Sequence, residues 1–325
     1  MKEEEIRPKQ IFDEYLRLAR ADTDTYFNNS IKESGTCPAC DTVGEQAFFK
    51  YNFTYETCPN CKTLFVNPRP KAEAFAKYYT ESPSSKYWAT TFYKETAHAR
   101  REKLWKPKAR LILQTLEKYN ASIHTLVDIG GGFGLFAEEI RNTCGQGPIV
   151  IEPGPDLAAA CREKSLSVVQ KFLEDVDTTD LPAGAKAFVS FELFEHLHNP
   201  SKFLRKLNSM MASGDIFIFT TLSGSGVDIQ ALWEDSKSVT PPHHLNFLNP
   251  RAINLLLTRL GFETLSVTTP GKLDIDILVN NQEAIKDRFW QTFVASATDE
   301  EKATMQQVIA ATGWSSHMMV VCRKP

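Results

Sequence analysis

The sequence has no long hydrophobic run, no internal repeat and no low-complexity tract. None of its apolar stretches approaches the roughly 18 consecutive residues that a membrane helix needs, so we expect no membrane span. The first ten residues, MKEEEIRPKQ, contain no hydrophobic segment of the kind found in a secretory signal. We therefore expect a cytoplasmic protein.

An excess of positive charge is missing as well. The 325 residues include 37 Lys and Arg against 40 Asp and Glu, which gives a formal net charge of −3. This balance argues against a nucleic-acid partner, because proteins that bind nucleic acids present a basic face. Hydrophobic residues make up 42% of the chain, which is ordinary for a globular protein and too much for a disordered one.

Cysteine is scarce, but four of the seven cysteines stand in two close pairs. Cys37 and Cys40 form one C-x-x-C pair, and Cys58 and Cys61 form the other after 17 intervening residues. Each pair directs two thiolates toward one point, and two pairs supply the four soft ligands of a tetrahedral Zn²⁺ site. A disulfide framework or a redox dithiol is the weaker interpretation, because intracellular thiols stay reduced. Four thiolates leave no position for water, so we expect a structural zinc.

The first part of the chain divides into three predicted segments. Residues 1–33 contain an amphipathic helix, which offers a surface for a homo-oligomer. Residues 34–70 form the zinc ribbon. Residues 71–120 are predicted to be a helical linker or lid, interrupted by a loop at 82–88.

From residue 121 to residue 325, short apolar strands alternate with helices. This alternation predicts a parallel sheet covered on both faces. The expected fold class is α/β, with a Rossmann-like, doubly wound, mostly parallel sheet of seven strands. A helical insertion at about 281–313 precedes the last strand.

The first of these strands runs into a glycine turn with the sequence LVDIGGGFG, which opens a helix. An α/β sheet binds nucleotide-like ligands at such a place, and glycine lets the backbone approach the ligand closely. The dinucleotide fingerprint starting at Gly130 would require a glycine at position 135, where this chain has Leu135. The pattern D-x-G-x-G-x-G instead resembles the first motif of class I S-adenosylmethionine-dependent methyltransferases.

The resemblance implies S-adenosylmethionine as the cofactor. It assigns the turn to cofactor binding through Asp128, Gly130, Gly131, Gly132 and Gly134. Glu152 fits the acid that binds the ribose hydroxyls, because a carboxylate accepts two hydrogen bonds from a diol. Glu192 ends the fourth strand, where ligands bind in open α/β sheets. Tyr87 and Arg100 are candidates either to close over the methionine end of the cofactor or to pack between domains.

Two further segments resemble motifs of small-molecule methyltransferases. FELFEHLHNP, at 191–200, resembles F-E-V-x-E-H-x-x-x-P, so Glu195 and His196 either take part directly or cap the following helix. PPHHLNF, at 241–247, resembles P-x-H-x-N/Y-F of enzymes that act on sugars. A sugar hydroxyl needs a base to lose its proton, and His244 is the first candidate, with His243 second.

The segment TPGKLDIDILVN, at 269–280, resembles a part of bacterial polysaccharide-associated methyltransferases. Asp274 and Asp276 within it either contact the substrate or solvate a strand.

Together these features predict a class I S-adenosylmethionine-dependent methyltransferase with an N-terminal zinc ribbon. Its expected partner is a small, sugar-containing acceptor, and the expected reaction is O- or C-methylation of a sugar, sugar nucleotide or glycan precursor in polysaccharide biosynthesis. Two alternatives remain: an RNA methyltransferase that uses the zinc ribbon as a reader, and a non-catalytic zinc-ribbon scaffold.

Overall fold

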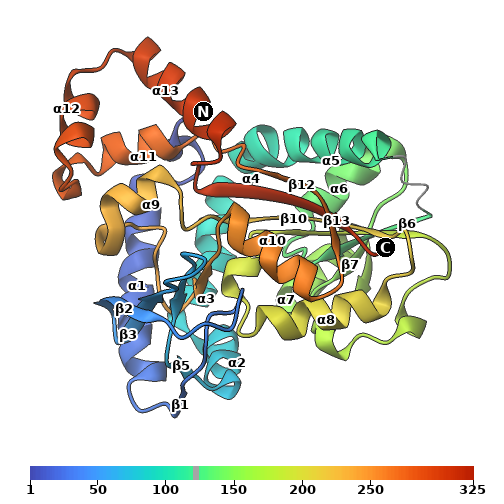
Figure 1. The fold of residues 1–325 in the computed structure, drawn as a ribbon. Coiled ribbons are helices and arrows are strands. Elements are labelled where there is room, and N and C mark those ends of the chain that lie inside the picture. Colours follow the sequence, from blue (N-terminus) through green and yellow to red (C-terminus); the bar gives the residue numbers. More distant parts are fainter. Residues whose placement is uncertain (120–123) are drawn as a thin grey trace.

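The computed structural model describes residues 1–119 and 124–325, and a seven-stranded sheet lies at the centre of its C-terminal part (Figure 1). The strands are β6 (Thr125–Ile129), β7 (Ile149–Ile151), β8 (Ser167–Val169), β9 (Lys186–Phe191), β10 (Ile216–Leu222), β12 (Glu263–Thr268) and β13 (His317–Arg323). They follow the order β12-β13-β10-β9-β6-β7-β8, and β13 runs in the direction opposite to the other six strands. The predicted mostly parallel, seven-stranded sheet is confirmed.

Helices cover both faces of this sheet because successive strand residues point to opposite sides. The helices are α5 (Lys106–Lys118), α6 (Leu135–Cys144), α7 (Pro155–Glu163), α8 (Pro200–Met210) and α10 (Pro250–Arg259). In β9, Phe188 packs in the hydrophobic cluster that includes α8 and α10, whereas Val189 packs in the cluster that includes α5 and α6. Cys161 of α7 packs against β7 and α6.

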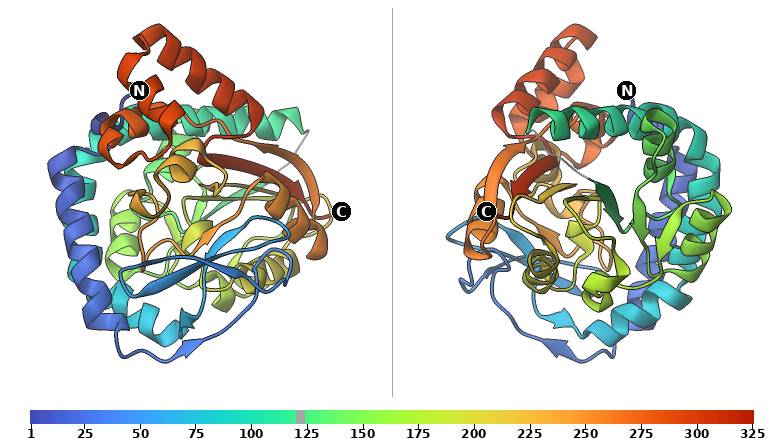
Figure 2. Two further views of the ribbon diagram at one scale, coloured as in Figure 1. Left: turned by 60° about the vertical axis from the view of Figure 1, so that its left-hand side comes forward. Right: turned by 90° about the vertical axis from the view of Figure 1, so that its right-hand side faces the viewer.

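The N-terminal part wraps along one side of the sheet domain as a series of helices (Figures 1 and 2). These are η1 (Glu3–Glu5), α1 (Lys9–Phe27), α2 (Ala72–Glu81), α3 (Pro83–Tyr87), η2 (Trp88–Phe92), α4 (Tyr93–Arg100) and η3 (Arg101–Trp105). The predicted loop at 82–88 is wrong, since α3 occupies most of it. Pro83 stands at the first helical position, and the Ser82 hydroxyl caps the helix by accepting a 3.2 Å hydrogen bond from the Ser85 amide. The predicted boundary at 120–121 lies outside the described residues.

A second sheet, of four strands, is built around the cysteine pairs. Its order is β11-β4-β3-β2, and it comprises β2 (Glu45–Lys50), β3 (Phe53–Thr57), β4 (Leu64–Val66) and β11 (Asn246–Phe247). The strand β11 comes from the PPHHLNF segment, and it pairs Asn246 with Phe65 and Phe247 with Leu64. A short antiparallel pair, β1 (Lys32–Glu33) with β5 (Arg69–Pro70), lies beside it in the chain. The sheet of the ribbon is therefore completed by the second half of the sequence.

The C-terminal helices project from the sheet domain (Figure 1). They are α11 (Asp274–Asn280), α12 (Arg288–Ser296) and α13 (Asp299–Thr312), and their apolar cluster includes residues of α9 (Val227–Leu232). The interpretation of Asp274 and Asp276 as solvent-facing residues of a strand is wrong, because both lie on α11. Asp274 is buried and accepts hydrogen bonds from the Ser315 hydroxyl and the Ser316 amide, at 2.6 and 2.7 Å. The 3₁₀ turns outside the N-terminal part are η4 (Leu173–Asp175), η5 (Thr178–Asp180), η6 (Phe194–His196), η7 (Trp233–Asp235) and η8 (Gln282–Ala284).

Asp228 of α9 lies fully buried beside Asp274. Burial, and then the charge of Asp274, raise the pKa of the Asp228 carboxyl well above its ordinary value. A carboxyl whose pKa is raised on folding contributes stability that is lost as pH rises through the folded pKa. The chain should therefore become less stable toward alkaline pH.

Asp228→Asn removes this titration and keeps the shape of the side chain. We expect the melting temperature of the variant to exceed that of the wild type, by an amount that grows from pH 6 to pH 10. Asp276→Asn, on the less buried side of α11, is the matched control and should follow the wild type. A difference between Asp228→Asn and the wild type that does not change with pH would contradict the buried-carboxyl explanation.

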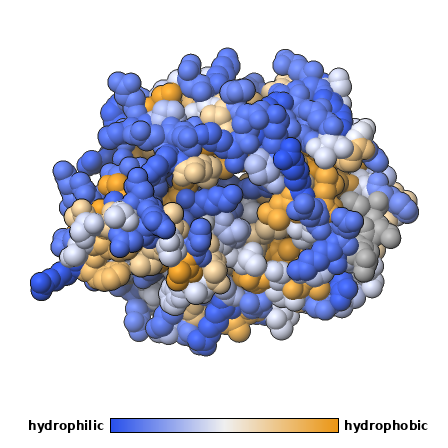
Figure 3. Space-filling model, turned by 90° about the horizontal axis from the view of Figure 1, so that it is seen from above, coloured by the Kyte–Doolittle hydropathy of each residue, from blue (hydrophilic) through white to orange (hydrophobic). Residues whose placement is uncertain are grey.

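The surface seen from above is mainly hydrophilic, with hydrophobic residues interspersed (Figure 3). Large exposed apolar side chains of the C-terminal helical part include Phe289, Val308 and Trp314. Among the residues that the structure describes, no helix combines the length and the apolar character that crossing a membrane requires.

Candidate functional site

The glycine turn lies at the carboxyl end of β6, where the chain order of the sheet reverses between β7 and β9. Ligands of open α/β sheets bind in the crevice at this point. Gly132 has φ +55°, in the left-handed region that favours glycine, and a Cβ built there would meet nothing within 4 Å. A Cβ on Gly134, at φ +70°, would instead meet Leu166 and Cys161. Gly132 thus borders open space, and Gly134 permits close packing of the turn.

Two buried carboxylates face this turn. Glu152 accepts hydrogen bonds from the amides of Gly132 and Gly154, each at 2.9 Å. Asp128 is 1% exposed, and its Oδ2 atom has no hydrogen-bond partner among the described residues. Burial, and then the nearby Glu152, raise the pKa of Asp128 to about 7. A buried acceptor oxygen without a donor fits a ligand that brings hydroxyl or amine protons.

The helices before the sheet place one aromatic ring on the turn. Tyr93 of α4 stacks on Phe133, with 3.9 Å between the ring centroids. Tyr87, the aromatic candidate predicted from sequence, instead packs against the cluster of Phe12, Tyr15 and Phe92. Tyr93 was not among the predicted site residues, although its spacing of seven residues from Arg100 places the two on one helix face.

Arg100 is partly buried, and its buried Nε atom has no partner among the residues that the structure describes. Burial lowers the pKa of its guanidinium, and the nearby Tyr93 opposes this change. A guanidinium with free donors is suited to binding a carboxylate.

Glu192 stands directly after β9 with φ +51°, a strained conformation for a residue other than glycine. It accepts a 2.7 Å hydrogen bond from the Thr220 hydroxyl and lies 3.5 Å from Lys108 Nζ and 3.4 Å from His317 Nδ1. Burial acts to raise the pKa of Glu192, but His317 and Lys108 outweigh it and hold the pKa at about 2. Glu192 is therefore a fixed negative charge at this edge of the sheet.

Lys108 and His317 were not among the predicted site residues. Lys108 comes from α5, and nothing in its local sequence distinguishes it. His317 begins the antiparallel strand β13, so it lies at the edge where the parallel strands end. A prediction that the last strand is antiparallel would have placed its first residue, His317, at the carboxyl edge of the sheet.

Glu195, His196 and His244 come together although they belong to two distant segments. Their ligand-type atoms all lie within 4.8 Å of one another, and the rings of His196 and His244 are 4.7 Å apart between centroids. Glu195 is 1% exposed and accepts a 2.8 Å hydrogen bond from the Thr221 hydroxyl. The helix α8 is capped by the Asn199 side chain, so Glu195 and His196 are not its caps.

The environment keeps both imidazoles of this cluster neutral. Burial, and then the neighbouring His244, lower the pKa of His196 to about 3, and burial lowers that of His244 to about 4. Burial, and then Glu192, raise the pKa of Glu195 to about 8. Both histidine side chains nevertheless keep accessible surface, which a ligand needs in order to reach them.

The two adjacent histidines of the loop differ in their hydrogen bonds. His244 Nδ1 lies 2.6 Å from the carbonyl oxygen of Ser238, so this nitrogen carries the proton in the neutral ring and Nε2 keeps its lone pair. His243 is buried, and its Nε2 lies 2.5 Å from the Tyr78 hydroxyl. The free imidazole nitrogen therefore belongs to His244, which stays the first candidate for the base, with His243 second.

The ribbon holds this loop in place. The Tyr55 hydroxyl donates to the carbonyl of His244 at 2.8 Å, and the Val66 amide donates to the carbonyl of Leu245 at 3.0 Å. The Leu245 amide in turn donates to the carbonyl of Glu195 at 2.8 Å. A continuous hydrogen-bonded path thus runs from the ribbon through the histidine loop to η6.

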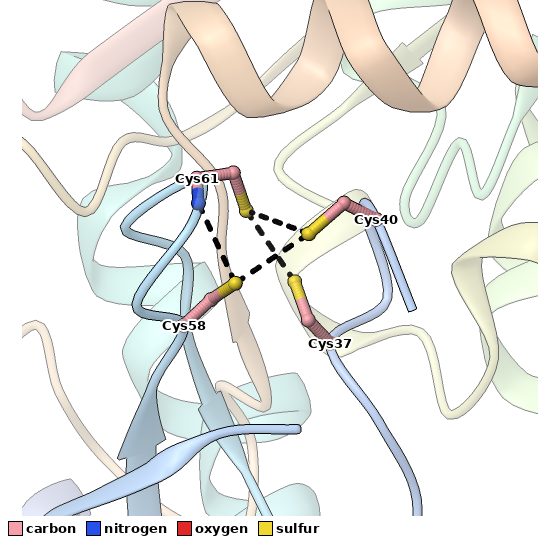
Figure 4. A group of neighbouring side chains, drawn as sticks. All are labelled: Cys37, Cys40, Cys58 and Cys61. Atoms are coloured by element: carbon pink, nitrogen blue, oxygen red, sulfur yellow. Dashed lines mark hydrogen bonds between the residues drawn. The ribbon is translucent and has the colours of Figure 1, made fainter. Parts of the chain in front are cut away.

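The four cysteines of the ribbon point toward one another from two turns (Figure 4). The Sγ atoms of Cys37 and Cys61 are 3.4 Å apart, and those of Cys40 and Cys58 are 3.5 Å apart. All four are free thiols, and thiolates around a zinc ion at about 2.3 Å are separated by roughly 3.8 Å. The group has the composition and the compactness that a tetrahedral metal site requires.

A family model described as a methyltransferase domain matches residues 97–267. No curated protein matches the chain. Among solved structures, the plantazolicin methyltransferase BpumL, in complex with a monoazolic analogue and S-adenosylhomocysteine, aligns with TM-score 0.50 and 11% identity over 77% of this chain and 93% of that one. A second structure is an S-adenosylmethionine-dependent methyltransferase of Thermotoga maritima, described as a possible histamine N-methyltransferase, with TM-score 0.43 and 14% identity over 72% of this chain and 98% of that one. A third, an S-adenosylmethionine-dependent methyltransferase of Archaeoglobus fulgidus, has TM-score 0.42 and 16% identity over 66% of this chain and 94% of that one. The likeness to BpumL shows a common fold.

Proposed function

The chain belongs to the methyltransferase domain family and is a class I S-adenosylmethionine-dependent methyltransferase, and from this premise we propose that it methylates a small, sugar-containing acceptor. The observation that carries the proposal is the juxtaposition, at one edge of the sheet, of the glycine turn with its carboxylates and of the Glu195, His196 and His244 cluster.

The residues around the turn fit the cofactor. When bound, S-adenosylmethionine supplies a methyl group on a sulfonium sulfur, which an acceptor takes by in-line displacement. The Oδ2 atom of Asp128 accepts no hydrogen bond from the described part of the chain, and Glu152 holds the turn through the Gly132 amide. Arg100 would offer guanidinium donors to the cofactor carboxylate, and Glu192 would offer a negative charge to balance the sulfonium.

Acceptor activation falls to His244 in this proposal. A hydroxyl is a poor nucleophile until it loses its proton, and a carbon beside a ketone must likewise lose one. His244 presents an unprotonated Nε2 next to His196 and Glu195, and its Nδ1 is fixed by Ser238. The same atom serves O-methylation and C-methylation, so both remain within the proposal.

The two alternatives receive less support. One edge of the ribbon sheet is occupied by β11 of the histidine loop, and the cysteine turns pack against the core beside α10, which leaves less of the ribbon free to read RNA. A scaffold would have no use for a carboxylate oxygen at Asp128 and a guanidinium nitrogen at Arg100 that both lack hydrogen-bond partners within residues 1–119 and 124–325.

The test uses S-adenosylmethionine labelled in its methyl group, incubated with the protein and with host extract separated into metabolites, glycans or lipids, and RNA. Label in the metabolite or glycan fraction is expected. Label in RNA would contradict a sugar-containing acceptor and support an RNA methyltransferase. Binding of S-adenosylhomocysteine without label in any fraction would favour a non-catalytic scaffold.

We also propose that the four cysteines bind one structural Zn²⁺. Cys58→Ser should abolish zinc retention and lower the melting temperature by roughly 10 °C, because several kcal/mol of metal-binding free energy are lost. Methyl transfer should fall as well, since the ribbon holds the histidine loop through Tyr55 and Val66. Zinc content and thermal unfolding are the measurements, and Cys144→Ser, at an exposed cysteine on α6, is the control. Equal zinc content in both variants would exclude the site.

A further inference from the structure

We infer that Glu195, His196 and His244 form a second metal site, which binds a divalent cation that contacts the acceptor oxygen. Two imidazoles and one carboxylate, with open positions left for other ligands, are a donor set that binds first-row divalent ions. The inference rests on the proposed function and assigns the means by which the cluster activates the acceptor.

The geometry of the three side chains suits one ion. Nitrogen and oxygen ligands about 2.1 Å from an ion lie roughly 3 to 4 Å from one another. The three donor atoms here already lie within 4.8 Å of one another, so small side-chain rotations bring them into range. His196 and Glu195 are neighbours on η6, and the hydrogen bond from the Leu245 amide to the Glu195 carbonyl holds the histidine loop against them.

Outer partners orient two of the ligands, as is usual in metal sites. Ser238 accepts from His244 Nδ1 at 2.6 Å, which leaves Nε2 as the donor atom for an ion. The Thr221 hydroxyl donates to Glu195 Oε2 at 2.8 Å, and Oε1 remains available. These hydrogen bonds leave His244 Nε2 and Glu195 Oε1 as the atoms available to an ion.

The burial of the cluster also suits a cation. The Glu195 side chain is 1% exposed, and its carboxylate accepts a hydrogen bond from the neutral hydroxyl of Thr221. A dication in contact with a buried carboxylate compensates the cost of removing its charge from water.

This site differs in kind from the cysteine site. Thiolates select zinc, whereas imidazole and carboxylate accept harder ions such as Mn²⁺. In the assigned step, the acceptor oxygen contacts the ion and its O–H bond breaks, with the proton passing to water. The oxygen–carbon bond then forms as the sulfur–carbon bond of the sulfonium breaks, and the thioether product leaves. Charge and atoms balance without any oxidant or reductant.

The experiment titrates Mn²⁺ into the zinc-loaded, full-length protein and follows the free ion by electron paramagnetic resonance. One bound Mn²⁺ per chain is expected. Glu195→Gln, which keeps the shape and the Thr221 hydrogen bond, and His196→Ala should each weaken Mn²⁺ binding by more than about 100-fold, since loss of an outer partner alone costs about 10- to 100-fold. His98→Ala, at an exposed histidine on α4, is the control and should bind like the wild type.

Binding of S-adenosylhomocysteine and methyl transfer in metal-depleted buffer are measured on the same samples. Mn²⁺ binding that both ligand variants lose, with S-adenosylhomocysteine binding retained, supports the site. A wild-type protein that binds no Mn²⁺ and transfers methyl groups equally well with and without the ion overturns the inference and leaves the proposed function intact. Failure to bind S-adenosylhomocysteine would instead count against the proposed function.

Discussion

Replacing Gly132 by valine is expected to weaken binding of S-adenosylhomocysteine by at least about 100-fold while zinc content stays unchanged. Gly132 has φ +55°, a conformation that costs a residue with a side chain about 1–2 kcal/mol and a β-branched residue more. Its amide also donates to Glu152 at 2.9 Å, so a shift of the turn displaces the carboxylate assigned to the ribose. Isothermal titration calorimetry measures the affinity.

The matched control is Gly145→Val at the end of α6. Gly145 has φ +80°, and a Cβ there would also meet nothing within 4 Å, so the two substitutions impose a comparable backbone strain. Gly145→Val should lose stability and keep its affinity. Equal loss of affinity in both variants, or an unchanged affinity in Gly132→Val, would remove the turn from cofactor binding.

His244→Ala is expected to lower turnover by about 10²–10⁴-fold with the affinity for S-adenosylhomocysteine unchanged. His244 lies on the loop before β11 and offers a free imidazole nitrogen to the acceptor, whereas the residues proposed for the cofactor belong to α4, to β6 and β7 with their loops, and to the end of β9. The loss is expected whether Nε2 takes the proton itself or binds the proposed ion, and the Mn²⁺ titration separates the two cases.

Turnover is followed with labelled methyl donor and the acceptor fraction identified in extract. His98→Ala again serves as the control for removal of a histidine. Turnover of His244→Ala within threefold of the wild type would exclude this side chain from the mechanism. A parallel loss of cofactor affinity would mean that the substitution disturbs the site as a whole.

The features that sequence predicted well are those encoded by neighbouring residues. The strand, the glycine turn and the helix form one continuous segment, and the cysteine pairs bring their own turns. In both C-x-x-C turns, the amide four residues after the first cysteine donates back to its carbonyl, from Asp41 to Cys37 and from Lys62 to Cys58. Such local geometry depends little on the rest of the fold.

The features that sequence missed depend on contacts between distant segments. Lys108 and His317 meet Glu192 only because α5 and β13 pack at the same edge of the sheet. A strand is one interpretation of the segment around Asp274, but this segment forms α11, and the buried Asp274 carboxylate accepts hydrogen bonds from Ser315 and Ser316 before β13. Tertiary packing outweighs local preference at these positions.

The pairing of β11 with β4 restricts how this protein can be divided or recombined. Deletion of residues 1–70 would remove the strand on which the histidine loop is hydrogen-bonded, so a shortened chain would keep its cofactor turn and lose the alignment of its acceptor side. Grafting the ribbon onto another methyltransferase would likewise require transfer of the PPHHLNF segment with it. Residues of β4 and β11 are therefore expected to covary in evolution, although the two strands are encoded in distant parts of the gene.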